Sequence, residues 1–354
     1  MLSSLIAGAA LALILGAAAW VIYGSPGSVS RSGVGLQAAA GGNPVLIKVE
    51  AGDSAAAIGR RLEKAGVIES AGSFRLLAEL TGSAAGLAAG EYEFNRGTSV
   101  LDALTRIRDG LTAARIVTVP EGLRLEEIAA LLEKRNVVPA ADFLAAANTL
   151  ATSGNGVGPD LIAGRPASAT LEGYFYPATF SFPRIAGAQE VALAMLRSLS
   201  QRLTPQLREE ARQQGLTLHQ VLTLASIVER EVVLPAERPV VASVFRNRLR
   251  IEMPLQADPT VQFAITARPG SVVQFGFWKR ELSAQDLQFD SPYNPYARKG
   301  LPPGPIANPG IDSILAVIRP AATSYLYFVA RHDGSHAFAA SFEEHERNVL
   351  RYQR

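Results

Sequence analysis

The feature that most constrains this chain is an uncharged apolar run close to its N-terminus. Residues 5–23 read LIAGAALALILGAAAWVIY, and no charged side chain occurs before Arg31. A helix rises about 1.5 Å per residue, so this run is long enough to cross a hydrocarbon core of about 30 Å. Trp20 and Tyr23 stand at its outer end, where amphipathic rings favour the membrane interface. The run therefore predicts a transmembrane anchor over residues 1–24.

The alternative to an anchor is a signal peptide cleaved at small residues such as Ala17 and Ala19. Charge says little about orientation, because no Lys or Arg precedes the span and only Arg31 follows closely. Residues 25–44 are rich in Gly, Ser and Ala, and we expect a flexible linker with a reach of about 25 Å.

Composition excludes several functional classes. The 354 residues carry 34 basic and 32 acidic side chains, so the net charge of +2 provides no general attraction to nucleic acid. The absence of cysteine excludes disulfides, thiolate zinc sites and cysteine nucleophiles. The four histidines show no metal-ligand spacing on one helix face. We therefore expect no metal, no cofactor and no nucleic-acid partner.

An internal repeat with an offset of 70 residues follows the linker. Residues 49–68 and 119–138 are identical at seven of twenty positions, including Gly52/Gly122 and Ile58/Ile128. Each copy has the pattern of a short strand, a glycine turn and an amphipathic helix. Between the copies we expect helices over 70–81 and 99–109 and a strand over 91–94. The units resemble LysM-like modules, which bind N-acetylglucosamine polymers. Direct glycan binding and a purely positioning role are both open for residues 45–150.

The C-terminal half carries the candidate chemistry. Residues 217–234 read TLHQVLTLASIVEREVVL and are predicted to form a helix. Leu222, Ala225 and Glu229 fall on one apolar face of it, which predicts a partly desolvated carboxyl with a raised pKa, as a general acid requires. A buried ion pair of Glu229 with Arg246 or Arg248 is the structural alternative. Glu231 points elsewhere and is predicted to be solvated or paired.

Ordered sequence blocks then identify a resemblance. They are LEGYFYPATF at 171–180, ASIVERE at 225–231, VASVFRNRL at 241–249, MPLQADPTV at 253–261, SPYNPY at 291–296, GLPPGPIANPG at 300–310 and YLYFVA at 325–330. In this order they resemble the YceG-like family of endolytic murein transglycosylases. Ala178 stands where the family commonly has Asp, Glu252 where it has Gly, and Glu346 where it often has Asn.

The resemblance implies an α+β chain: the N-terminal transmembrane helix, a LysM-like β-α module and a mixed α/β catalytic domain over 168–354. It implies a lyase that cleaves the β-1,4 bond between N-acetylmuramic acid and N-acetylglucosamine within peptidoglycan strands. The products would carry 1,6-anhydro-muramic ends, and cleavage would terminate nascent strands. A single catalytic carboxyl suffices for this reaction, and the family motif assigns it to Glu229.

Implied partners are glycan strands, the cytoplasmic membrane and peptidoglycan synthases. The polar residues of the motifs are the candidate substrate-binding residues: Glu172, Tyr174, Gln256, Asp258, Thr260, Tyr293 and Asn294. Phe175 and Tyr176 are further candidates for stacking on sugar rings. Two rival functions are a lyase acting on a small chorismate-derived substrate and a non-enzymatic glycan-binding scaffold.

The uncharged run predicts a single uncleaved span in the cytoplasmic membrane, with residues 25–354 outside it. A reporter that is active only outside the cytoplasm, fused to the C-terminus, should be active. N-terminal sequencing of the mature protein should start before residue 20. A reporter active only in the cytoplasm, or a later mature start, would contradict this topology.

Overall fold

The computed structural model describes residues 44–353 except 113, 185 and 269, so the predicted anchor lies outside the described residues. The chain forms two compact units, Met1–Ala114 and Arg115–Arg354. Within the described ranges no helix has the length and apolarity needed to cross a membrane. The division differs from the predicted module at 45–150, because the second repeat copy belongs to the second unit.

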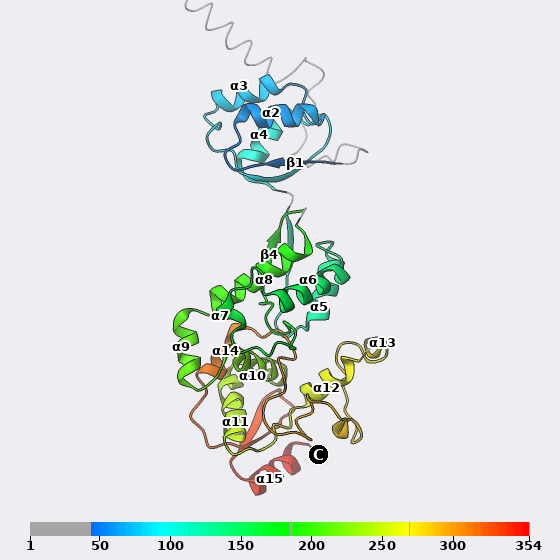
Figure 1. Cartoon of the computed structure of the whole chain (residues 1–354), viewed down its shortest axis with the longest axis vertical. Coiled ribbons are helices and arrows are strands. Elements are labelled where there is room, and N and C mark those ends of the chain that lie inside the picture. The colour runs from blue at the N-terminus through cyan, green and yellow to red at the C-terminus, as the bar shows by residue number, and fades with distance from the viewer. Residues whose placement is uncertain (1–43, 113, 185, 269, 354) are drawn as a thin grey trace, which may run out of the picture. The chain divides into compact units, whose positions relative to one another are not determined.

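The first unit is a small α+β fold. Its elements are β1 (Val45–Val49), α2 (Ala55–Lys64), α3 (Ala71–Leu80), β2 (Gly90–Phe94) and α4 (Val100–Arg108). The two strands pair antiparallel, with Val45 opposite Phe94 and Val49 opposite Gly90. The helices α2, α3 and α4 lie beside this pair of strands (Figure 1). The strand and helices predicted between the repeat copies are confirmed within a residue or two.

Local sequence explains these helices. Ser54, Ser70 and Ser99 each accept a hydrogen bond from a first-turn backbone N–H, which satisfies a donor that the helix itself leaves unpaired. Ile58 and Leu62 lie four residues apart on α2 and are fully buried in the unit's own core. The LysM-like character of this unit and its binding of glycan stay predictions.

The second unit holds the remaining elements. Its N-terminal part contains β3 (Arg115–Thr118), α5 (Leu125–Lys134), α6 (Ala140–Ser153), α7 (Pro159–Ile162), β4 (Thr179–Phe182), α8 (Ala188–Arg202) and α9 (Pro205–Gln213). Its C-terminal part contains α10 (Leu218–Glu231), α11 (Arg238–Arg250), α12 (Asp258–Thr266), α13 (Ser271–Phe275), α14 (Ile311–Ile318), β5 (Tyr327–Ala330), β6 (His336–Ala339) and α15 (Phe342–Tyr352). Short 3₁₀ turns cover Pro235–Glu237 and Asp286–Gln288. The predicted α+β class is confirmed, with helices dominating.

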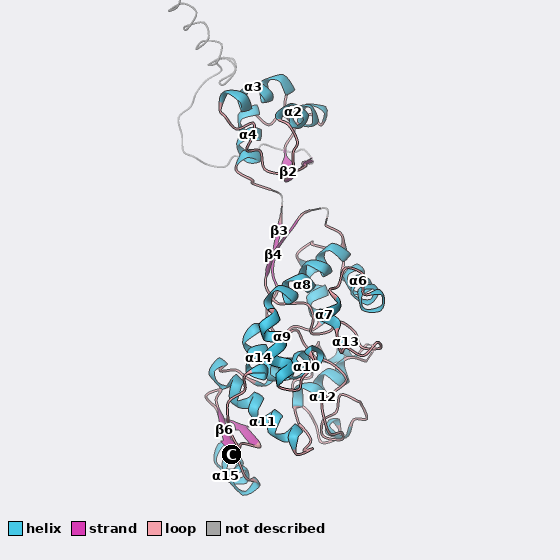
Figure 2. Ribbon diagram, turned by 60° about the vertical axis from the view of Figure 1, so that its left-hand side comes forward, coloured by secondary structure: helices cyan, strands magenta, loops and turns pink. Residues whose placement is uncertain are grey.

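Two small antiparallel ladders stand at opposite ends of this unit (Figure 2). The strands β3 and β4 pair with Val117 opposite Phe180, and β5 and β6 pair with Phe328 opposite Phe338. The strand β3 directly precedes the second repeat copy, and its partner β4 begins at the end of the LEGYFYPATF block. Val117 of β3 and Ile128 of the second copy are buried in the same core as α10.

Helix α10 is the centre of the second unit. Thr217 caps its N-terminus in a reciprocal capping box with Gln220, as the predicted helix over 217–234 requires. All residues from Val221 to Val228 are buried, because α11, α12 and α14 all contact this helix (Figure 1). A helix that is apolar on all sides in this way is a core element. Its C-terminal end, where the helix becomes polar, therefore sits at a fixed place in the unit.

Gly173 in the LEGYFYPATF block has φ +83°, and a Cβ there would overlap the side chain of Pro305. Gly215 has φ +71° with open space around the same position. A left-handed alanine costs about 1–2 kcal/mol by itself, and forced overlap in a packed core adds about 1–3 kcal/mol. Gly173→Ala should therefore lower the free energy of unfolding by about 3 kcal/mol, and Gly215→Ala by about 1 kcal/mol. Urea unfolding measures both, and equal losses would contradict the predicted packing against Pro305.

Candidate active site at the end of helix α10

The last turn of α10 carries two carboxyl groups in different surroundings. The side chain of Glu229 is 6% exposed. Its Oε1 lies 2.9 Å from Nη2 of Arg238, and its Oε2 accepts a hydrogen bond of 3.0 Å from the backbone N–H of Gly310. The ion pair foreseen as the structural alternative therefore exists, but its cation is Arg238 rather than Arg246 or Arg248. Both Glu229 oxygens act as acceptors.

Arg238 gathers further acidic groups. Glu121 Oε2 lies 3.8 Å from its guanidinium, and Asp312 Oδ2 lies 3.5 Å from it. Burial raises the pKa of Glu121, and the negative charge of Glu229 adds to the rise. The repeat contained a signal for Glu121 that the sequence analysis missed: the equivalent position in the first copy is Ala51, so this carboxyl has no counterpart there.

Glu231 occupies the other environment. Burial raises its pKa to about 8, the negative charge of Asp258 adds to the rise, and Arg248 opposes it. The Arg248 guanidinium is itself occupied, because it donates to the carbonyl oxygens of Leu326 and Leu255, each at 2.6 Å. Glu231 was expected to be solvated or paired with a basic side chain; it is half-buried, and Arg248 is the basic group that acts on it. Its carboxyl has the desolvated character that the helix pattern predicted for Glu229.

Exposed polar groups accompany Glu231. Gln256 and Asp258 are both exposed at the start of α12, as expected for substrate-binding residues. The hydroxyl of Tyr296 donates to Asp258 Oδ1 at 2.6 Å, and this tyrosine was not among the predicted site residues. Gln256 adopts φ +49° and its N–H donates to the carbonyl oxygen of Pro295 at 3.3 Å, which joins two of the sequence blocks. Glu231, Asp258 and Tyr296 thus form one polar cluster.

Tyr293 is half-buried and lines a cavity of about 170 Å³ between the SPYNPY and GLPPGP blocks. Its ring packs on Phe263 with centroids 5.0 Å apart. Burial raises the pKa of its hydroxyl to about 12, so the group is a hydrogen-bond donor at neutral pH. Tyr293 therefore stays a predicted substrate-binding residue.

The other predicted substrate-binding residues are buried and have structural partners. Asn294 is fully buried, and its amide donates to the carbonyl oxygens of Leu287 and Phe289, which holds the loop. Thr260 is fully buried and its hydroxyl donates to the carbonyl oxygen of Ala257. Both side chains therefore have structural partners, and their contact with a substrate stays a prediction.

Tyr174, Phe175 and Tyr176 are at most 5% exposed, so none of them stacks on a sugar ring. The Tyr174 hydroxyl lies 3.0 Å from Nδ1 of His219, whose Nε2 lies 2.8 Å from the carbonyl oxygen of Pro303. Burial raises the pKa of Tyr174 and lowers that of His219. This chain of contacts ties the LEGYFYPATF block to α10 and to the GLPPGP loop.

Glu172 is 5% exposed and is likewise an internal residue, not a groove acid. Its carboxyl accepts hydrogen bonds from the backbone N–H of Leu125, at 2.9 and 3.1 Å, and from the Asn308 side-chain amide at 2.9 Å. Burial raises its pKa to about 8, although the Leu125 and Gly173 N–H groups favour the carboxylate. Asn308 also donates to the carbonyl oxygen of Leu123 at 2.9 Å. Glu172 and Asn308 thus join the second repeat copy to the ANPG loop.

Arg230, between the two carboxyl residues, fastens the end of α10 to the second repeat copy. Its guanidinium carbon lies 4.0 Å from the ring centroid of Trp278, and its Nη1 lies 3.5 Å from the carbonyl oxygen of Gly122. The Trp278 indole N–H donates to Glu127 of α5 at 2.9 Å. These contacts restrict where Glu229 and Glu231 can lie.

No cluster of three or more His, Asp or Glu side chains that could hold a metal ion occurs among the residues that the structure describes. The two carboxyl groups at the end of α10 are suited to proton chemistry, because one is desolvated and the other is held in an ion pair.

Comparisons with known proteins identify the family of the chain. The model of the YceG-like family matches residues 47–351, and the chain belongs to that family. An endolytic murein transglycosylase of Bacillus subtilis strain 168 is 33% identical over 316 residues, which cover 87% of this chain and 84% of the relative. The Streptococcus pneumoniae D39 protein of the same name is 31% identical over 327 residues, but only 58% of its length is covered.

A crystal structure of a yceG-like protein from Listeria monocytogenes is also similar. It has a TM-score of 0.56 and 31% sequence identity, and the match covers 86% of this chain and 99% of that chain. The family suggested by the sequence blocks is thus confirmed.

Glu172→Gln should destabilise the protein. The amide of Gln would place one N–H₂ group against the N–H donors of Leu125, Gly173 and Asn308, where the native carboxyl accepts. An unsatisfied buried donor costs about 1–3 kcal/mol, and urea unfolding should show a loss of that size. Glu209→Gln on the exposed face of α9 is the control and should be near neutral. Unchanged stability of Glu172→Gln would contradict the hydrogen-bonded role.

Proposed function

We propose that this chain is an endolytic peptidoglycan lytic transglycosylase, with Glu231 as the group that transfers the proton. The observation that carries this assignment is the desolvated Glu231 carboxyl near the exposed Asp258. The family and the names of the relatives support a murein transglycosylase. The bond cleaved, the anhydro product and the termination of nascent strands belong to the proposal.

We infer Glu231 rather than Glu229, the residue that the motif resemblance assigned, from the raised pKa of Glu231 and the ion pair of Glu229. A general acid must hold a proton near neutral pH, and the raised pKa of Glu231 meets this requirement. Glu229 instead accepts from Arg238 and from Gly310 N–H, so donating a proton would break contacts that hold α10, α11 and the ANPG loop together. Glu229 is better suited to position the helix end.

The reaction needs one carboxyl for both proton transfers. Glu231 donates its proton to the glycosidic oxygen as the bond from C1 of muramic acid to that oxygen breaks, which releases the leaving sugar with a free hydroxyl. The Glu231 carboxylate then takes the proton of the muramic C6 hydroxyl, whose oxygen bonds to C1 and closes the 1,6-anhydro ring. No water is consumed, and Glu231 regains its proton.

Asp258 is the feature that a hydrolytic alternative would use. Glycoside hydrolases employ two carboxyl groups, one as acid and one as base or nucleophile. The negative charge of Asp258 contributes to the raised pKa of Glu231, and the Tyr296 hydroxyl donates a hydrogen bond to Asp258. The chemical form of the muramic ends separates the two reactions, because hydrolysis leaves reducing ends and transglycosylation leaves anhydro ends.

The proposal includes a place of action. The uncharged run at 5–23 supports a single-pass anchor in the cytoplasmic membrane, with the described units on the outer side, where peptidoglycan is found. Synthases that elongate strands are the proposed partners. C-terminal reporter activity tests the location, and cross-linking of the full chain to synthases in cells tests the partnership.

Glu231→Gln keeps the size of the side chain but can neither donate as a carboxylic acid nor accept as a carboxylate. The rate of cleavage of purified peptidoglycan should fall by about 10²–10⁴-fold or more, because both proton transfers are lost. Glu229→Gln should instead lower stability by about 1–3 kcal/mol, because it removes the nearest acidic partner of Arg238 while Glu121 and Asp312 remain beside it, and the folded fraction should retain measurable cleavage. Mass spectrometry of wild-type products should show internal cuts with 1,6-anhydro-muramic ends.

The pH profile provides an independent check. The rate of the wild-type enzyme should fall as pH rises through about 8, because Glu231 then loses the proton that it must donate. If Glu231→Gln cleaves normally while folded Glu229→Gln is inactive, Glu229 is the acid. Reducing muramic ends would overturn the transglycosylase mechanism in favour of a hydrolase using Asp258.

A further inference from the structure

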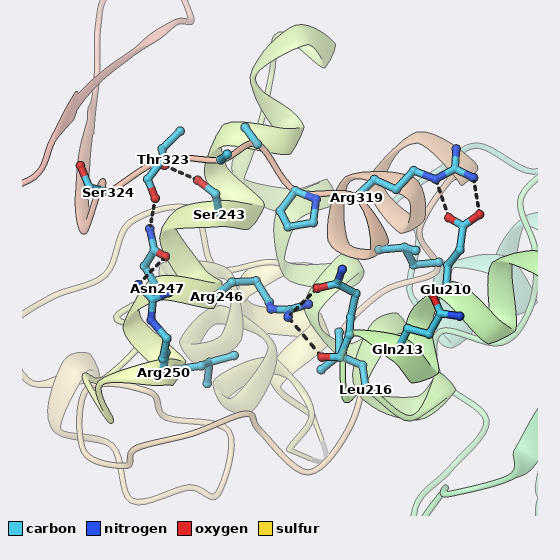
Figure 3. Close-up of a pocket in the computed structure, with 16 residues that line it drawn as sticks. Glu210, Gln213, Leu216, Ser243, Arg246, Asn247, Arg250, Arg319, Thr323 and Ser324 are labelled. Carbon is cyan, nitrogen blue, oxygen red and sulfur yellow. Dashed lines mark hydrogen bonds and ion pairs between the residues drawn. The ribbon is translucent and has the colours of Figure 1, made fainter.

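A groove of about 1060 Å³ lies on a part of the second unit that the proposed reaction does not use. Helices α9, α11 and α14 and the segment 319–324 form its walls (Figure 3). None of the residues assigned above to the polar cluster around Glu231 lines it. A volume of this size is typical of sites that hold a small molecule or a short peptide.

The centre of the groove is the guanidinium of Arg246, which extends from α11 toward the chain after α9 (Figure 3). Its Nη2 lies 3.3 Å from the carbonyl oxygen and 3.2 Å from the side-chain oxygen of Gln214. Its Nη1 is buried and has no hydrogen-bond partner. Burial lowers the pKa of Arg246, and no ion pair joins it to an acidic side chain within the described ranges.

The Arg246 side chain is half-buried, and its charge has no acidic partner in the described part of the chain. A partly desolvated cation is stabilised when an anion and hydrogen-bond acceptors compensate for its charge. The neighbouring Arg319 shows the compensated case, because Glu210 accepts from it at 2.6 and 2.9 Å. Arg250 is exposed at the other side of the groove and adds a second positive charge without an acidic partner among the described residues. The groove therefore has an excess of positive charge centred on Arg246.

The rest of the lining suits a short chain rather than a single ion. Residues 321–324 form neither helix nor strand, and they are held in place from below. Asn247 donates to the carbonyl oxygen of Thr323 at 2.9 Å, and the hydroxyls of Ser243 and Thr323 lie 2.6 Å apart. Leu216 and Leu249 are half-buried and provide apolar surface beside the arginines. A ligand with a carboxylate and small apolar side groups matches this combination.

We infer that this groove binds a carboxylate of the short peptide that substitutes the glycan substrate, with Arg246 as the anchoring residue. The choice of this peptide rests on the proposed function, whereas the match of a carboxylate to Arg246 does not. Arginine pairs with carboxylates through two parallel N–H donors, and no acidic side chain among the described residues pairs with the Arg246 guanidinium. The groove would thereby distinguish peptide-bearing strands from bare glycan.

Calorimetry of the full-length protein in detergent tests this inference. The Glu231→Gln background keeps the experiment independent of cleavage. The probe is a synthetic stem tetrapeptide with free carboxyl groups, compared with the same peptide fully amidated. The free acid should bind at least about tenfold more tightly than the amide, because a charge-assisted pair is lost. Arg246→Gln should weaken binding of the acid about tenfold, and Arg246→Lys should weaken it less.

Arg197→Gln, an exposed position on α8 outside the groove, is the matched control and should leave binding unchanged. Thermal unfolding of each variant verifies that it is folded. Equal affinities for acid and amide, or unchanged binding by folded Arg246→Gln, would overturn the inference. So would acetate binding as tightly as the peptide, or preference for an all-L peptide that mimics a protein tail. Loss of the proposed function would appear differently, as absent glycan cleavage by the wild-type enzyme with peptide binding retained.

Discussion

The structure depends on how buried carboxyl groups are compensated. A carboxyl removed from water needs hydrogen-bond donors, a cation or a proton, and three glutamates of the second unit illustrate this. Glu172 receives N–H donors from Leu125, Gly173 and Asn308. Glu229 receives the guanidinium of Arg238 and a backbone N–H. Burial raises the pKa of both Glu172 and Glu231 to about 8, but Glu172 is enclosed by its donors, whereas Glu231 neighbours the exposed Asp258. Glu172 and Glu229 connect parts of the chain, and Glu231 is the carboxyl proposed to react.

The second repeat copy has been incorporated into the enzyme-like unit. Its turn pairs with the ANPG loop, because Gly122 N–H donates to the carbonyl oxygen of Asn308 and Asn308 N–H donates to that of Leu123, both at 2.8 Å. The strand β3 directly before it pairs with β4, and its helix α5 holds Trp278, against which Arg230 packs. The first copy lacks these partners and folds around its own core. The two similar β-α segments thus have different roles. The first packs in its own core, and the second contacts and positions the end of α10.

Positive charge is handled in two ways on the two faces of α11. Arg238 and Arg248 are buried among acceptors that balance them, which stabilises the region around the candidate active site. Arg246, two residues before Arg248, points into the groove with one nitrogen unpaired. Because a helix places residues two positions apart on different faces, one short segment, VASVFRNRL, contributes to both regions. Proton transfer and recognition of a substrate substituent would then share one rigid support.

Much of this protein follows from the sequence alone. Serine and threonine caps, the 3.6-residue periodicity and the glycine turns determine the helices around 55–64, 71–80 and 218–231, and the ordered blocks determine the family. The exposed Gln256 and Asp258 were also within reach of sequence reasoning. The state of each carboxyl was not, because Glu229 and Glu231 lie on one turn and their difference arises from Arg238, Gly310 and Asp258, which are distant in sequence or belong to other elements. Burial of Tyr174 and Asn294 likewise depends on loops meeting across the unit. Local patterns determine elements, whereas desolvation and charge pairing are decided only where distant segments meet.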